Sequence, residues 1–314
     1  MQIAKAMPLD GDKVYGSLLG LVLADALGSR FEGMQPEALH QQFSSKPAAF
    51  KYALLRDNLR YTDDGQMTIA LAEYLTESPR ICSDDLMRSF VRAYESWRGY
   101  GRGARVLIEA FRDDAEYEFM AEHLFPGGSL GNGAAMRSAP VGLRYFGDTT
   151  TIWHEAKNSA WPTHRHELGI EGAQLIALAT SLAASDWAIG PRTLAEALLP
   201  SCTTVVFQNR LKCLAEVVGP DDIAQFGNGI EAHESVVTAL ACFALYPTDF
   251  QNAVATAFWQ GGDTDTIGAM TGALVGARVG SGFASSMPLD RLEEGPNFIA
   301  YLQDLSNRLT ASQK

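Results

Sequence analysis

The sequence predicts an all-α protein, organised as a single domain over residues 1–314. Apolar residues recur at helical spacing through most of the chain, and no convincing run alternates apolar and polar residues as a half-buried strand would. No low-complexity linker divides the chain. Hydrophobic residues make up 46% of the 314 positions and charged residues 20%, which is ordinary for a soluble globular protein with a sizeable core.

Charge and cysteine content narrow the possible partners and the compartment. The net charge of −12 argues against a general surface for nucleic acid or anionic membrane. The four cysteines are far apart and form no C-x-x-C pair, which favours a reducing compartment. Residues Met1–Lys5 lack the apolar segment of a signal peptide, and the longest apolar run, Val236–Tyr246, is shorter than the roughly 20 residues that span a bilayer. We therefore expect a cytoplasmic protein that binds neither nucleic acid nor membrane.

The first predicted helix covers Asp12–Leu27 and carries a strongly apolar stripe. Small residues that would let a neighbouring helix approach closely lie along it: Gly16, Ser17, Gly20 and Ala24. Asp25 interrupts the apolar surface, and we expect it to be a hydrogen-bonded structural residue. Glu32 lies on the glycine-flanked loop that follows, and such loops often carry function.

Two acidic turns each begin a predicted helix. In the first, Thr62-Asp63-Asp64, either Thr62 or Asp63 can cap the helix that follows. The second, Gly261–Thr266, places two carboxylates and two hydroxyls on a glycine turn before a helix that begins near Thr266. Each turn alone is an acidic first turn of the kind that the helix dipole favours. Together they offer the oxygen ligands that Mg²⁺ takes, so we expect the fold to bring them together around divalent metal.

Three other segments carry groups that could bind a phosphate or a metal. Phe125–Gly133 is a glycine-rich loop whose amides suit phosphate oxygens, although a tight turn explains the glycines equally well. The loop Arg98–Gly103 carries two arginines that could grip a phosphate, although solvated arginines are commoner on loops. The cluster His164-Arg165-His166-Glu167 could suggest zinc, but no further histidine cluster exists to complete such a site.

The remaining predicted helices complete the chain. They cover Ser83–Arg98 (capped by Ser83 or Asp84), Thr150–Ala184 with a break at 161–167, part of 192–224, Val236–Tyr246, Phe250–Gln260 and Arg291–Lys314. In the helix after the second acidic turn, Gly268, Gly272 and Gly276 recur every four residues. Because glycine lowers helix stability, close packing or a ligand must compensate.

Five motifs occur in an order that resembles the ADP-ribosylglycohydrolase family. They are Tyr61–Met67, Gly128–Arg137, Thr163-His164, Gly227–Ser235 and Gly261–Thr266. The resemblance implies a single-domain orthogonal helical bundle that binds two Mg²⁺ ions, for which Mn²⁺ can substitute. It looks closest to the serine-ADP-ribose hydrolase branch, although Asp63–Thr68 resembles the bacterial arginine-type enzymes.

The resemblance also implies roles for residues that match the family's motifs. The implied metal ligands are Thr62, Asp63, Asp64, Asp263, Asp265 and Thr266. Glu32 matches a carboxylate near the scissile bond, and the catalytic base would be Glu32, Asp63 or Asp64. The implied substrate-binding residues are Gly101, Gly128, Ser129, Gly131, Asn132 and His164.

Two positions depart from the family pattern. Gly65 stands where threonine is usual, which we expect to loosen the first acidic turn. Leu130 stands where the serine-specific branch carries a tyrosine, so Phe125 or Tyr100 would have to supply an aromatic face for adenine.

The resemblance implies a monomeric, Mg²⁺-dependent hydrolase that releases ADP-ribose from modified protein side chains, through serine or arginine, or from related conjugates. Water must be delivered to an anomeric carbon with oxocarbenium character, a task for which positioned carboxylates are suited. Two alternatives stay open: a non-catalytic ADP-ribose-binding or crystallin-like structural protein on the same scaffold, and a metallophosphohydrolase that cuts the diphosphate. The intact acidic turns favour the enzyme over the non-catalytic scaffold.

Overall fold

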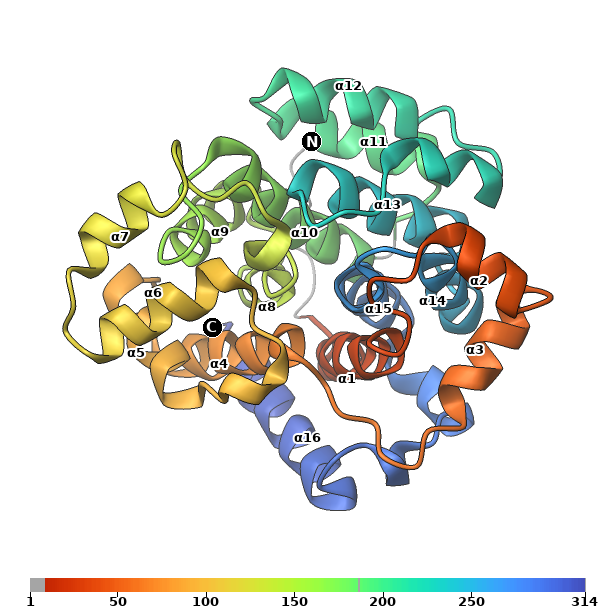
Figure 1. Cartoon of the computed structure of the whole chain (residues 1–314), viewed down its shortest axis with the longest axis horizontal. Coiled ribbons are helices and arrows are strands. Elements are labelled where there is room, and N and C mark those ends of the chain that lie inside the picture. The colour runs from red at the N-terminus through yellow and green to blue at the C-terminus, as the bar shows by residue number, and fades with distance from the viewer. Residues whose placement is uncertain (1–8, 186, 314) are drawn as a thin grey trace.

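The computed structural model describes residues 9–185 and 187–313, and within them the chain forms helices and no β-strand (Figure 1). The all-α prediction is confirmed. Two isolated bridges join Leu59 to Leu292 and Gly131 to Glu231. No helix in this part of the chain is long and apolar enough to cross a membrane. The prediction that Met1–Lys5 is not part of a signal peptide concerns residues outside the described ranges.

The helices follow one another along the whole chain. The α-helices are α1 (Gly11–Gly28), α2 (Pro36–Gln42), α3 (Lys46–Leu54), α4 (Asp63–Glu77), α5 (Ser83–Ala93), α6 (Arg102–Arg112), α7 (Tyr117–His123), α8 (Ala139–Arg144), α9 (Thr149–Ala160), α10 (Glu167–Ala184), α11 (Pro191–Leu198), α12 (Val205–Leu214), α13 (Ala232–Leu245), α14 (Phe250–Trp259), α15 (Thr264–Val279) and α16 (Gly295–Ala311). The short 3-10 helices are η1 (Ser96–Arg98), η2 (Asn132–Ala134), η3 (Leu199–Ser201), η4 (Pro220–Phe226), η5 (Gly280–Ser286) and η6 (Leu289–Arg291).

Helices α1 and α15 run antiparallel at the centre of the molecule (Figure 1). Their backbones touch, because a Cβ atom added to Gly272 would collide with the carbonyl of Gly20, and one added to Gly276 would collide with that of Gly16. The Ser17 hydroxyl donates to the Ala273 carbonyl at 2.9 Å across the same contact. The expectation that the small residues of both helices serve close packing is confirmed.

Several helix ends differ from the sequence-based boundaries. Helix α5 ends at Ala93 rather than at Arg98, and its N-cap is Cys82, so the prediction of a Ser83 or Asp84 cap is wrong. The chain leaves the helix because the Glu95 amide donates to the Gln66 side chain at 3.1 Å, which joins this segment to α4. Helix α15 begins two residues earlier than predicted, at Thr264, with Asp263 as its N-cap.

We expect Gly272→Ala to destabilise the protein by about 1–3 kcal/mol, because backbone of α1 occupies the space that the methyl group needs. Gly282→Ala is the matched control, since no neighbouring atom lies within 4 Å of the added Cβ. Urea denaturation of both variants measures the difference. Equal stability of the two variants would contradict the close contact between α1 and α15.

Candidate active site

The first acidic turn is held by a carboxylate from α1. Asp25 is fully buried and accepts the amide hydrogens of Thr62 and Gly65, each at 2.9 Å. Thr62 is the N-cap of α4, and its hydroxyl accepts the amide hydrogen of Asp64 at 3.3 Å. The expectation that Asp25 is a hydrogen-bonded structural residue is confirmed. Its position orients the turn that presents Asp63 and Asp64.

The second acidic turn is fastened to two loops. The Gly33 amide donates to the Gly262 carbonyl, and the Gly262 amide donates to the Met34 carbonyl, both at 2.8 Å. This pair of bonds brings the loop that carries Glu32 beside the turn. The Asp263 amide donates to the Asn228 carbonyl at 2.9 Å. Gly262 has φ +68° and no room for a side chain against Asn228, so this turn requires glycine.

The hydroxyl of Thr264 does not face the carboxylates. It is buried and donates to the Gly28 carbonyl at 2.9 Å, which joins the first turn of α15 to the end of α1. Thr264 is therefore a structural residue, and the side chains that remain available on this turn are Asp263, Asp265 and Thr266.

The acidic side chains of the two turns experience one another's charge. Burial raises the pKa of Asp63 to about 7, and the charges of Asp263 and Glu32 act in the same direction. Burial, together with neighbouring carboxylates, also raises the pKa of Asp64 and Asp265. The fold thus brings both acidic turns together in a partly dehydrated place, where a positive charge would be strongly favoured.

The glycine-rich loop forms the opposite wall and reaches the second turn through Asn132. The Asn132 amide group donates to Asp263 Oδ2 at 2.5 Å and to the Ser235 hydroxyl at 2.9 Å. The backbone of Asn132 donates to the Ile230 carbonyl at 2.9 Å, which pairs the loop with the segment before α13. The loop then enters the short 3-10 helix η2, so its glycine amides do not lead directly into an α-helix.

A cavity of about 350 Å³ lies between these segments. The predicted site residues that line it are Glu32, Asp63, Asp64, Gly101, Ser129, Gly131, Asn132, His164, Asp263 and Thr266. Three predicted residues do not line it: Thr62, which caps α4, Asp265, which is on α15, and Gly128, which packs against the backbone of Arg165 and His166. The structure therefore gathers most of the predicted residues in one place, while their individual roles stay predictions.

The arginine loop contributes to the cavity differently from the prediction. Arg98 is buried and pairs with Glu293 at 2.7 Å and with Glu95 at 2.6 Å, so the prediction that it could grip a phosphate is wrong. Arg102 is exposed and lines the cavity. The pairing of Arg98 with Glu293 joins segments 195 positions apart, which local sequence reasoning cannot foresee.

The two departures from the family pattern have clear structural settings. A Cβ at Gly65 would lie 2.9 Å from the Tyr61 ring and 3.0 Å from Asp25, so the turn is tightly packed and the expectation that Gly65 loosens it is wrong.

Of the two candidates for an aromatic face, Tyr100 is buried and donates to the Gln66 side chain at 2.7 Å, which makes it unsuitable as an open aromatic face. Phe125 lines the cavity with 36% of its surface exposed and is suited to that role.

Two residues of the Gly227–Ser235 motif, to which the sequence alone assigned no role, shape the site. The Asn228 carbonyl accepts the Asp263 amide hydrogen of the second acidic turn, and the Asn228 side chain donates to the Gln260 carbonyl at 2.7 Å. Ile230 is 68% exposed and lines the cavity. The available signal was the turn Gly227-Asn228-Gly229 followed directly by an apolar residue, a pattern that places a large side chain next to a tight turn.

The residues of the two turns suit a hard divalent cation. Asp64 Oδ1 is buried and has no hydrogen-bond partner among the described residues, and its carboxylate lies among others of like charge. Carboxylate and hydroxyl oxygens are ligands that Mg²⁺ accepts. Within residues 9–185 and 187–313 no three His, Cys, Asp or Glu side chains form a ready metal cluster, so any complete ligand set would also draw on hydroxyls and water. The six predicted ligands stay a prediction.

We expect millimolar Mg²⁺ to raise the melting temperature by several degrees at constant ionic strength, because a ligand at about 100 times its Kd adds about 2.7 kcal/mol of stability. Asp263→Asn should remove most of this increase. Asp114→Asn, which changes an acidic residue of a different cavity, should leave the increase unchanged. Differential scanning calorimetry measures the shift, and an identical response of all three proteins would contradict a cation site between the acidic turns.

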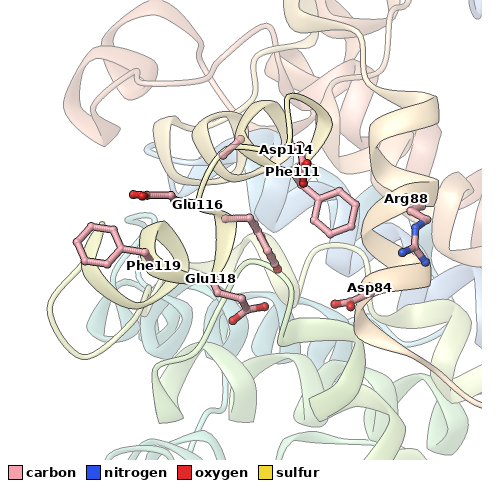
Figure 2. Close-up of a pocket in the computed structure, with 9 residues that line it drawn as sticks. Asp84, Arg88, Phe111, Asp114, Glu116, Glu118 and Phe119 are labelled. Atoms are coloured by element: carbon pink, nitrogen blue, oxygen red, sulfur yellow. The ribbon is translucent and has the colours of Figure 1, made fainter.

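A larger cavity, of about 820 Å³, opens between α5, α6 and α7. Figure 2 shows the four carboxylates that line it together with one arginine and two aromatic side chains: Asp84, Asp114, Glu116, Glu118, Arg88, Phe111 and Phe119. It contains none of the predicted site residues, so size alone does not identify the active site.

A family model and several known proteins are similar to this chain. The model of the family described as ADP-ribosylglycohydrolase matches residues 7–314. The ADP-ribosylhydrolase ARH3 of Xenopus tropicalis is 32% identical over 302 residues, covering 83% of this chain and 85% of that protein. The human protein of the same name is 32% identical over 311 residues, covering 84% and 85%. A solved structure described as an ADP-ribosylglycohydrolase-related protein complex has a TM-score of 0.66 at 23% identity and covers 97% of this chain and 99% of its own, which confirms the predicted fold type.

Proposed function

Because the chain belongs to the ADP-ribosylglycohydrolase family, we propose that it hydrolyses the glycosidic bond between ADP-ribose and a modified protein side chain, serine or arginine, or a related conjugate. The observation that carries this proposal is the cavity whose acidic end holds Glu32, Asp63 and Asp64 and whose other wall is the glycine-rich loop. Such a cavity can hold the diphosphate against backbone amides while carboxylates face the bond to be cut.

The reaction breaks the bond between the anomeric carbon and the acceptor atom of the side chain. The oxygen of a water molecule adds to that carbon and keeps one hydrogen as the new hydroxyl, the other water proton passes to a carboxylate, and the acceptor atom leaves with the proton that a carboxylate returns. Glu32, Asp63 and Asp64 all line the cavity, and each is a candidate for the base. Two Mg²⁺ ions, when bound, would orient ribose hydroxyls and polarise the water.

The protein's own residues also order the site. Asn132 donates to Asp263 and thereby holds the second acidic turn against the glycine-rich loop. Asp25 holds the first turn through two backbone amides. These bonds keep the carboxylates in place before the substrate arrives, which lowers the cost of organising them during the reaction.

The direct test offers serine-linked and arginine-linked ADP-ribosylated peptides side by side, with Mg²⁺ and with excess chelator. We expect release of free ADP-ribose from at least one peptide in Mg²⁺ and none in chelator. In Asp263→Asn we expect the rate of ADP-ribose release to fall at least 100-fold, because the charge that develops in the transition state would lose its main electrostatic support. Release of AMP would instead indicate a metallophosphohydrolase. Tight binding of ADP-ribose without turnover would indicate the non-catalytic scaffold, and full activity in chelator would exclude the two-metal mechanism.

We also infer that the protein works as a monomer in the cytoplasm. The support is chemical: the structure gives all four cysteines as free thiols, with Cys202 and Cys242 buried, which suits a reducing compartment.

We expect Phe125→Ala to raise the Kd for free ADP-ribose, since stacking of a base on an aromatic ring contributes about 1–3 kcal/mol. Phe125 lies over Gly103 at the rim of the cavity, 2.7 Å from the place where a Gly103 Cβ would be. Phe119→Ala is the matched control, because Phe119 is an exposed aromatic residue of the other cavity. Isothermal titration calorimetry with ADP-ribose gives both values, and equal Kd values would rule out Phe125 as the adenine platform.

A further inference from the structure

A buried arginine lies behind the cavity and has no role in the reaction described above. Arg137 has no exposed surface, and its guanidinium donates to the Gly133 carbonyl at 2.8 Å and to the Ser159 carbonyl at 3.0 Å. It also donates to the Thr163 hydroxyl at 2.7 Å. Burial lowers the pKa of Arg137 to about 10, so the side chain keeps its charge at neutral pH.

The Thr163 hydroxyl connects this arginine to the imidazole of His164. Thr163 Oγ1 lies 2.8 Å from His164 Nδ1, and Thr163 is buried. Because a guanidinium can only donate, Thr163 Oγ1 accepts from Arg137 and retains one hydrogen of its own to donate. Within the described residues, His164 Nδ1 is the one acceptor in reach of that hydrogen. A proton on Nδ1 would leave the buried hydroxyl hydrogen without a partner, at a cost of about 1–3 kcal/mol.

The other ring nitrogen opens to the cavity. His164 lines the cavity, and its Nε2 makes no hydrogen bond within the described residues. This nitrogen is also not among the fully buried polar atoms that have no partner, so it is accessible from the cavity. Gly131 and Gly133 flank it, since Cβ atoms there would lie 3.5 Å and 3.3 Å from Nε2. Burial beside Arg137 lowers the pKa of His164 to about 3, so the imidazole is neutral at physiological pH.

We propose that Arg137 and Thr163 are positioning residues that hold His164 as its Nε2–H tautomer, so that the imidazole donates a hydrogen bond to an oxygen of the bound ligand and accepts none. The choice of ADP-ribose as that ligand rests on the proposed function; the tautomer does not. A neutral donor suits a phosphate or ribose oxygen, because it offers a directional hydrogen bond without burying another charge beside Arg137.

The tautomer is measured directly on the full chain labelled with ¹⁵N-histidine, by two-bond ¹H–¹⁵N correlation at pH 7. His164→Gln identifies the His164 signals by their loss. We expect a pyrrole-type Nε2 and a pyridine-type Nδ1 in the wild-type protein. A pyrrole-type Nδ1 would overturn the proposal, whatever the protein's activity.

Two substitutions of Thr163 test whether its hydroxyl sets the tautomer of His164. Thr163→Val removes the donor, and we expect a mixture of tautomers and a Kd for free ADP-ribose that rises roughly 2- to 13-fold, the equivalent of one hydrogen bond. Thr163→Ser keeps the hydroxyl and should retain both the Nε2–H spectrum and the wild-type Kd. Unchanged tautomers in Thr163→Val, or the same loss in Thr163→Ser, would overturn the role of Thr163. If ADP-ribose fails to bind the wild-type protein, the proposed function fails while the spectrum still decides the tautomer.

Discussion

The contact between the backbones of α1 and α15 is the constraint on which the site depends. Glycine in a helix interior costs about 1 kcal/mol relative to alanine, yet both helices carry glycine where they cross, and a methyl group at Gly272 would collide with α1. The close approach brings the end of α1 to the beginning of α15, where Thr264 donates to the Gly28 carbonyl. Asp25 and the second acidic turn consequently lie at the same end of the helix pair.

This arrangement concentrates negative charge where water is scarce. The Asp25 carboxylate accepts hydrogen bonds from backbone amides. Burial raises the pKa values of three other carboxyl groups nearby, those of Asp63, Asp64 and Asp265. Buried like charges are unfavourable unless a cation or protons offset them. A chain with a net charge of −12 could thus attract an anionic ligand locally, provided that bound cations and backbone amides outweigh the overall charge.

The cavity walls are loops, but hydrogen bonds fix each of them to another element. Gly33 pairs with Gly262, Asn132 with Ile230, and Asp263 with Asn228. Behind the wall, Arg137 ties Gly133 to Thr163 and so sets the position of His164. The larger cavity of Figure 2 has carboxylates on its rim instead, and two of them, Asp114 and Glu116, lie on the short segment between α6 and α7. Preorganisation distinguishes the two cavities better than their volumes do.

The sequence by itself determined the features that depend on neighbouring residues: the helical periodicity, a cap at Thr62 or Asp63, the two acidic turns and the glycine spacing of α15. Tertiary structure decided the features that depend on distant partners. Arg98 pairs with Glu293 instead of facing the cavity, and Tyr100 is buried against Gln66. Asn228 forms hydrogen bonds with a segment that follows it by more than thirty positions. A side chain's chemistry is local, but its direction and its partner depend on which segments the packed core brings beside it.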